Sequence, residues 1–165
     1  MSRTSGKVSG LVSFLSLMSG GSLVLFGGGS LLISGFAGAL AGALVGLALL
    51  GHGFFELKQR KLFLGDPSVG VARKLAWNQG ALAGSVILYL GWQARSIDRA
   101  VISAMLNRDP LESLLAQMPP GTAEQINAEL PRLLVAFYSL AALLVLAGCL
   151  GMAFMYLRSA AETER

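Results

Sequence analysis

Apolar positions along the chain gather into four long runs, which are separated by shorter polar or glycine-rich segments. The runs cover residues 8–26, 31–54, 75–92 and 133–157, and none of them contains Asp, Glu, Lys or Arg. A helix needs about 20 predominantly apolar residues to cross the hydrocarbon core of a bilayer. Each run therefore predicts a membrane-spanning helix, and the whole chain, residues 1–165, is expected to form a single membrane domain.

The only sizeable polar segment, residues 93–132, lies between the third and fourth runs. Apolar residues recur there at helical spacing, whereas Asp109-Pro110 and Pro119-Pro120-Gly121 interrupt the pattern. Short amphipathic helices of this kind lie on membrane surfaces or cover the end of a bundle. The expected fold class is all-α: an integral membrane four-helix bundle with short amphipathic helices between its third and fourth helices.

Turn signals divide the runs. The first two runs are joined only by Gly27-Gly28-Gly29-Ser30, which predicts a tight antiparallel hairpin with its turn at this point. Asp66-Pro67 has the pattern of a helix N-cap followed by proline at the first helical position. We therefore expect the third helix to begin near Pro67, before its membrane-embedded part.

Composition supports lipid as the solvent for these runs. The chain of 165 residues is 54% hydrophobic and only 13% charged, against about 25% charged residues in soluble domains. A soluble domain of this length could not bury so much apolar surface. The net charge is +4, but the basic residues cluster beside the apolar runs, so they indicate membrane orientation and not a nucleic-acid partner.

Basic residues are distributed unequally between the two sides of a four-span topology. One side carries nine of them and the other side four: Arg3, Lys7, Lys58, Arg60, Lys61, Arg73, Lys74, Arg158 and Arg165 against Arg95, Arg99, Arg108 and Arg132. Basic loops stay in the cytoplasm, which places both termini there and the outer segment 93–132 outside. The basic loop 58–74 is then expected to meet anionic inner-leaflet lipids.

The N-terminal run has a second interpretation. Arg3 and Lys7 precede an apolar stretch, as in the charged and hydrophobic regions of a signal peptide. The run continues to Phe26, however, and its removal would take one helix from the hairpin. We therefore favour a retained first helix, while cleavage remains open on the sequence alone.

Glycine recurs every four residues in GFAGALAGALVG, at Gly38, Gly42 and Gly46. A dinucleotide-binding loop would need the order GxGxxG after a strand, and this order is absent. In lipid, small residues at this spacing let two helix backbones approach closely. The stripe predicts helix packing, either against the first helix, which we favour, or between copies of the chain in a dimer or ring.

Two further sets of small residues have packing spacing. Ser9, Ser13 and Ser16 lie on one side of the first run, and Gly80 and Gly84 are four apart in the third. Serine hydroxyls can hydrogen-bond between membrane helices. A hydrated lumen could use the same serines, although pore linings usually add charges or amides.

Four polar residues at the membrane boundary are the candidates for interhelical or ligand contacts. Asn78 and Gln79 lie near the start of the third run, and His52 and Glu56 are four apart, hence on one helical face. One His and one Glu are too few ligands for a metal site, and Cys149 is the only cysteine. We expect no metal, no cofactor and no catalytic residue. We expect His52 and Glu56 to pair with each other, or one of them to pair with Arg73 or Lys74.

The segments HGFFELKQRKLFLGDP, LAWNQGALAG and ILYLGW together resemble a pattern of small uncharacterised bacterial multi-pass inner-membrane proteins. In that pattern a helix ends in an acidic and basic segment, Gly-Asp-Pro follows, and the next helix opens with Asn-Gln. The resemblance covers residues 51–92. It implies a location in the bacterial inner membrane and carries no functional residue.

Three classes of function are compatible with these features. We expect a non-enzymatic accessory or scaffold subunit that engages other membrane proteins, because the helices are rich in packing residues and the outer segment is larger than a simple turn. The alternative is a small channel or transporter that self-assembles through its glycine stripe. An intramembrane enzyme is the least favoured class, because the runs contain no carboxylate and only one His and one Cys.

Overall fold

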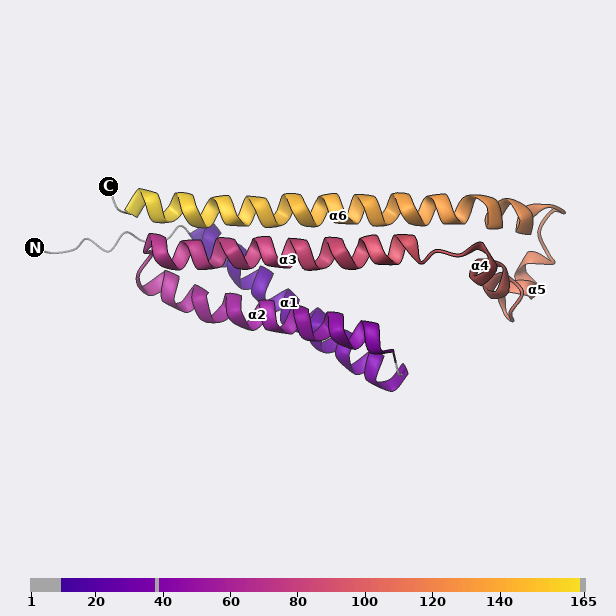
Figure 1. The fold of residues 1–165 in the computed structure, drawn as a ribbon, viewed down its shortest axis with the longest axis horizontal. Helices are drawn as coiled ribbons and strands as arrows, with labels where there is room; N and C mark the ends of the chain where they lie inside the picture. Colours follow the sequence, from indigo (N-terminus) through magenta and orange to yellow (C-terminus); the bar gives the residue numbers. More distant parts are fainter. Residues whose placement is uncertain (1–9, 38, 164–165) are drawn as a thin grey trace, which may run out of the picture. The chain divides into compact units, whose positions relative to one another are not determined.

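The computed structural model describes residues 10–37 and 39–163, apart from the side chains of residues 37, 99, 101 and 105. Two residues of the predicted packing faces, Ser9 and Gly38, therefore lie outside the described residues. Throughout the described part the regular structure is helical (Figure 1). The helices are α1 (Gly10–Ala37), α2 (Leu40–Gly65), α3 (Val69–Arg95), α4 (Arg99–Leu106), α5 (Leu111–Leu115) and α6 (Thr122–Thr163).

Three of the described helices are long and apolar enough to cross a membrane. They are α1, α2 and α6, which contain the predicted runs 8–26, 31–54 and 133–157 or most of them. The expectation of an all-helical membrane protein is confirmed at this level. The remaining predicted span, residues 75–92, lies inside α3, which has 27 residues but lower hydropathy because of residues such as Asn78 and Gln79.

The predicted turn at Gly27-Gly28-Gly29-Ser30 is wrong. Helix α1 continues through these residues, and the chain reverses between α1 and α2, where the Ala39 N–H donates to the Ser34 carbonyl at 2.9 Å. Glycine inside a helix costs about 1 kcal/mol relative to alanine in water. In lipid, however, the backbone has no water to bond with, so the helix persists, and Gly27 is needed for contact with α2.

Helix boundaries also differ from the apolar runs in α2, α3 and α6. Helix α2 continues beyond the predicted limit at residue 54 to Gly65. Helix α3 begins at Val69, two residues after Pro67 and close to its expected start. Helix α6 begins at Thr122 and passes through Pro131. The extension of α2 has a functional consequence, because it brings Glu56 and Arg60 into a helix that could span the membrane.

The chain divides into two compact units, residues 1–86 with 145–165 and residues 87–144. In the first unit, α1 and α2 form an antiparallel hairpin whose backbones meet at glycines seven residues apart: Gly20 and Gly27 on α1, Gly46 and Gly53 on α2. A Cβ added to Gly46 would lie 2.8 Å from the Gly27 carbonyl oxygen, and one added to Gly53 would lie 3.0 Å from that of Gly20. Side chains could not fit at these positions, so the glycines set the separation of the two helices.

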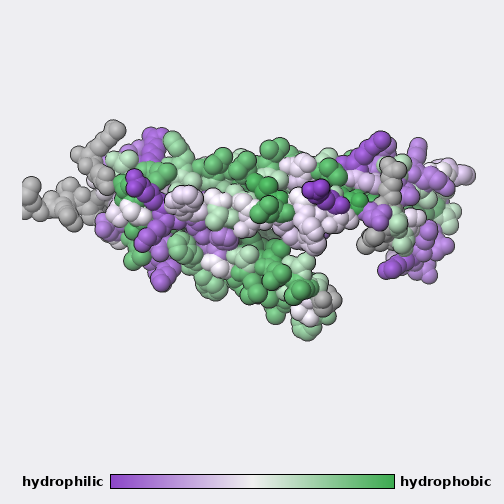
Figure 2. Space-filling model, in the orientation of Figure 1, coloured by the Kyte–Doolittle hydropathy of each residue, from purple (hydrophilic) through white to green (hydrophobic). Residues whose placement is uncertain are grey.

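Apolar side chains of four helices form the core of the first unit. The cluster consists of Val12 from α1, Phe63 from α2, Ala72 and Leu75 from α3, and Tyr156 and Ala160 from α6. Phe63 and Tyr156 pack edge to face, with ring centroids 5.7 Å apart. Many other large apolar side chains of the described residues are exposed, and hydrophobic surface covers much of the α1–α2 hairpin and of α6 (Figure 2). Such a surface suits lipid, where apolar side chains need no internal partner.

The second unit contains the segment expected to form short amphipathic helices. Residues 93–132 include α4, α5 and the first turns of α6, and α4 contacts α5. Ile102 of α4 is buried, whereas Leu111 and Leu114 of α5 are exposed together with Glu112. The exposed leucines beside a charged residue give α5 the mixed surface of an interfacial helix.

Candidate functional site

A buried carboxylate joins all four long helices of the first unit. Glu56 of α2 is 0% exposed, and its Oε1 accepts a hydrogen bond from the Tyr156 hydroxyl of α6 at 2.8 Å. Its Oε2 accepts from the Gln79 amide of α3 at 2.7 Å and from the Ser19 hydroxyl of α1 at 3.1 Å. A buried carboxyl group is costly unless donors surround it, so these three contacts account for its place in the interior.

The donors around Glu56 are neutral. The ion pairs found among the described residues, Glu129 with Arg132 and Glu162 with Arg158, both lie on exposed parts of α6. A carboxylate offers about four acceptor positions, and hydroxyl and amide groups fill three of those on Glu56. The arrangement therefore holds the carboxyl group through hydrogen bonds from separate helices and not through a direct ion pair.

One turn before Glu56, His52 pairs with Asn78 of α3. The His52 Nδ1 lies 2.8 Å from the Asn78 Oδ1, and the Asn78 amide also donates to the His52 carbonyl at 3.2 Å. Asn78 and Gln79 are consecutive on α3, so they reach two successive turns of α2. The pair fixes the alignment of α3 against α2, since sliding either helix would break both contacts.

One turn after Glu56, Arg60 bonds to α1. Its Nε donates to the Ser13 carbonyl at 3.2 Å and to the Ser16 hydroxyl at 3.1 Å, and its Nη2 donates to the Ser13 hydroxyl at 3.1 Å. His52, Glu56 and Arg60 recur every four residues and occupy one face of α2 over about 12 Å. We call these three residues and their bonded partners the polar column.

The polar column includes several residues that the sequence singled out. His52, Glu56, Asn78 and Gln79 belong to it, and so do Ser13 and Ser16. The expected direct pairing of His52 with Glu56, or of either with Arg73 or Lys74, is replaced by bonds to α3, α1 and α6. The reason is geometric: the buried face of α2 is turned toward these helices, and Arg73 and Lys74 are exposed on α3.

Sequence reasoning missed three members of the polar column. Ser19 follows Ser13 and Ser16 at the same spacing of three residues, so the serine series itself could have indicated it. Arg60 lies four residues after Glu56 and could have been placed on the same face if the helix had been extended. Tyr156 gave no such signal, because it is 100 residues from Glu56 and lies in an apolar run.

The described glycines predicted to pack against other helices do so in α2 but not in α3. Gly42 and Gly46 face α1, where Gly42 approaches the Ser34 side chain and Gly46 approaches the backbone of Gly27. Gly80 and Gly84 are exposed on α3, and an added Cβ at either would meet no atom within 4 Å outside its own helical surroundings. Among the described residues, the predicted glycines that make close helix–helix contacts therefore lie in the α1–α2 hairpin, and those of α3 make none.

The polar column provides hydrogen bonds between helices and one buried carboxyl group. Within the described residues no three His, Cys, Asp or Glu side chains gather in a way that could hold a metal ion. Gln59, three residues after Glu56, is 8% exposed, and its Oε1 has no hydrogen-bond partner in the described part of the chain. An acceptor of this kind next to the column offers a place for a hydrogen-bond donor.

Three long apolar helices and an interior polar column define a helical membrane protein. Comparison with protein-family models, with curated proteins and with solved structures finds no match to this chain. The resemblance of residues 51–92 to small bacterial inner-membrane proteins therefore stays an expectation.

Proposed function

We propose that the chain is a non-enzymatic, multi-pass protein of the bacterial inner membrane that acts as an accessory or scaffold subunit for other membrane proteins. The observation that carries the proposal is the contrast between its interior and its surface. The residues of the polar column bond to one another, whereas only Cys149, Tyr156 and Ala160 are buried among the residues of α6. Binding capacity for other molecules is therefore concentrated on the outer helical faces.

Helix α6 supplies the best surface for a partner. Of its 42 residues, only Cys149, Tyr156 and Ala160 are buried. Gly148 and Gly151 are exposed, and an added Cβ at either would meet nothing within 4 Å. Helices associate in membranes through close backbone approach at small residues, so this face of α6 suits a helix of another protein.

The proposal includes α3 as the fourth span. The residues that lower its hydropathy, Asn78 and Gln79, are only 8% and 2% exposed and bond to α2. Beyond Trp77, the surface that α3 would present to lipid consists mainly of small and apolar residues. Four spans place both termini with the 66–68 connection, and the excess of basic residues on that side favours the cytoplasm.

Topology can be tested with cysteines introduced at Ser68 and Ser113 in a Cys149→Ala background. We expect a membrane-impermeant maleimide to label residue 113 in intact cells, and residue 68 only in inverted vesicles, because α3 separates the two positions. A permeant maleimide should label both and serves as the control. Labelling of both positions from the same side would show that α3 does not cross the membrane.

Partner binding can be tested with a photo-crosslinking residue in place of Gly151. In native membranes we expect a stoichiometric adduct with another membrane protein, because this position lies on the open face of α6. The same residue at Phe36, which is 92% exposed at the end of α1, is the matched control and should give little adduct. Equal and non-specific adducts at both positions would contradict an accessory role.

One observation favours the alternative of a small channel or transporter. The apolar runs contain no charged residue, but Glu56 is buried inside α2, a candidate span. Ionisable residues inside the membrane often belong to ion or proton paths. A tracer flux through reconstituted protein that Glu56→Gln abolishes, or a Gly151 adduct with a second copy of this chain, would favour this alternative over a scaffold.

A further inference from the structure

We propose that a shallow groove between α3 and α6 binds one anionic phospholipid, with the lipid phosphate on Arg73 and an acyl chain along α3. The inference goes beyond the scaffold function. It rests on the proposed four-span topology, because α3 must lie in the bilayer for the groove to face lipid.

The groove lies within the first unit, at the basic end of the helices. Its volume is about 340 Å³, and it is lined by Arg73, Ala76 and Trp77 of α3 and by Leu157 of α6. Trp77 is 79% exposed although it is one of the largest apolar side chains. Three of the four lining residues are apolar and the fourth is a cation, which is the composition expected for a molecule with an anionic head and an apolar tail.

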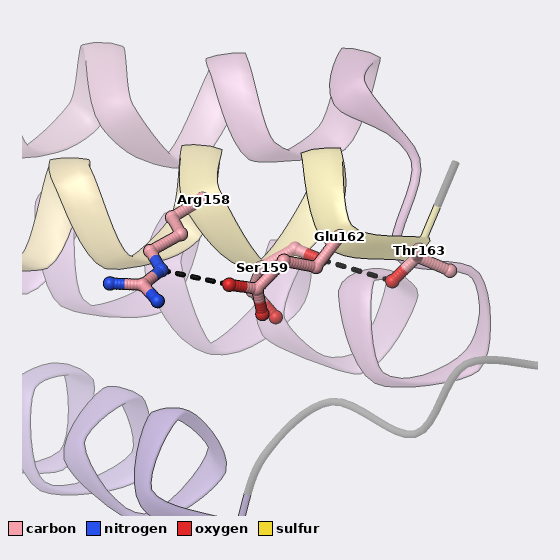
Figure 3. A network of polar contacts seen from close by, with 4 residues as sticks. All are labelled: Arg158, Ser159, Glu162 and Thr163. Carbon is pink, nitrogen blue, oxygen red and sulfur yellow. Dashed lines mark hydrogen bonds and ion pairs between the residues drawn. The ribbon is translucent and has the colours of Figure 1, made fainter. Parts of the chain in front are cut away.

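Arg73 is the lining residue that can hold a phosphate. Its side chain is exposed, no ion pair to it is found among the described residues, and the groove lining contains no acidic residue. By contrast Arg158, which follows Leu157 on α6, is already bonded to Glu162 with Nε and Oε1 2.8 Å apart (Figure 3). Arginine binds phosphate through two parallel N–H donors, so Arg73 offers the unoccupied anion-binding group at this position.

Trp77 places the groove at the surface of the bilayer. It follows Arg73 by one helical turn, and exposed tryptophan is enriched where the headgroups meet the hydrocarbon core. The apolar part of a lipid bound to Arg73 would then begin at the level of Trp77. Basic pockets between helices on the cytoplasmic side are a recurring site for anionic headgroups.

Gly80 and Gly84 follow the groove residues along α3, toward the centre of the proposed span. They lie seven and eleven residues after Arg73, on the same face of α3 as Arg73 and Trp77. An added Cβ at either glycine would meet nothing within 4 Å. Beyond Trp77 this face therefore carries two positions without a side chain, the second about 16 Å from Arg73, where an acyl chain that passes Trp77 can lie against the helix backbone.

A specific groove differs from a general attraction of basic residues to an anionic surface. Lys74 is adjacent to Arg73 and is also exposed, but it does not line the groove. A general attraction would depend on both residues alike, since each basic residue near the surface contributes to it. Comparison of Arg73→Gln with Lys74→Gln therefore separates the two explanations, because each variant loses one positive charge.

The chain contains two tryptophans, so Trp92→Phe leaves Trp77 as the only one. We propose to reconstitute this variant in phosphatidylcholine vesicles that contain an increasing fraction of brominated phosphatidylglycerol or, in a parallel series, of brominated phosphatidylcholine, whose bromines quench adjacent tryptophan. Half-maximal quenching is expected at an about fivefold lower fraction of phosphatidylglycerol, the effect of one basic contact. Arg73→Gln should abolish this difference, whereas Lys74→Gln should keep it.

Three results would overturn the proposal. Equal losses in Arg73→Gln and Lys74→Gln would show a diffuse electrostatic attraction. Equal quenching by both brominated lipids in the parent protein would show an apolar surface that does not recognise the headgroup. No quenching by either lipid would place Trp77 outside the bilayer and contradict the four-span topology as well, while the crosslinking test of the scaffold function would stay independent.

Discussion

Replacing Glu56 by alanine is expected to lower the free energy of unfolding by roughly 2–5 kcal/mol, because three interhelical hydrogen bonds of about 0.6–1.7 kcal/mol each are lost. The Tyr156 hydroxyl, the Gln79 amide and the Ser19 hydroxyl all donate to this carboxyl group. Removing it leaves their donors without an acceptor in the interior. The change can be measured by reversible unfolding in mixed micelles with increasing dodecyl sulfate.

Two variants control this experiment. Glu162→Ala removes an exposed carboxylate that pairs with Arg158 within α6, and such surface pairs contribute about 0–1 kcal/mol. Tyr156→Phe removes one of the three donors but keeps the edge-to-face contact with Phe63, so it should show about a third of the loss. If Glu56→Ala were no more destabilising than Glu162→Ala, the polar column would not hold the helices together.

Leucine at Gly46 is expected to destabilise the α1–α2 hairpin by about 3 kcal/mol, the upper end of the usual cost of overpacking. The added Cβ would lie 2.8 Å from the Gly27 carbonyl oxygen and 2.9 Å from the Leu31 nitrogen. Both are backbone atoms, so the strain cannot be relieved by a change of rotamer. The hairpin would have to separate, which also weakens the contacts of Ser13 and Ser16 with Arg60.

Gly51→Leu is the matched control in the same helix. Gly51 is exposed, and an added Cβ there would meet nothing within 4 Å. Leucine is a better helix former than glycine by about 0.8 kcal/mol, so this variant should be neutral or slightly stabilising. Unfolding of both variants under the same conditions gives the comparison, and equal behaviour would disprove the close approach of the two helices.

The helical class and three spanning helices follow from the length and apolarity of the runs, because in lipid the backbone must bond within its own segment. The end of α1 could not be predicted in this way. Gly27 has the propensity of a turn residue, but its contact with Gly46 on a different helix decides its conformation. At Gly27 the preference of glycine for turns and the contact with Gly46 favour different conformations, and the chain adopts the helical one that the contact requires.

For the candidate site, the spacing of residues along the sequence predicts members of the polar column only where they are close together in the chain. The four-residue spacing of His52 and Glu56 places both on one face, and the sequence alone makes Asn78 and Gln79 candidates for interhelical contacts. Tyr156 comes from a helix whose sequence shows an almost uniform apolar surface. Nothing in a uniformly apolar run indicates which face turns inward, so the pairing of Tyr156 with Glu56 is seen only in the folded chain.

The spacing of the hairpin glycines has a further consequence for the alignment of α1 and α2. Gly20 and Gly27 are separated by the same seven residues as Gly46 and Gly53. A slide of one helix by seven residues, about 10 Å, would bring Gly27 opposite Gly53 and restore a close backbone approach. The glycine seam alone is therefore compatible with more than one register, and the hydrogen bonds from Arg60 to Ser13 and Ser16 select a single one.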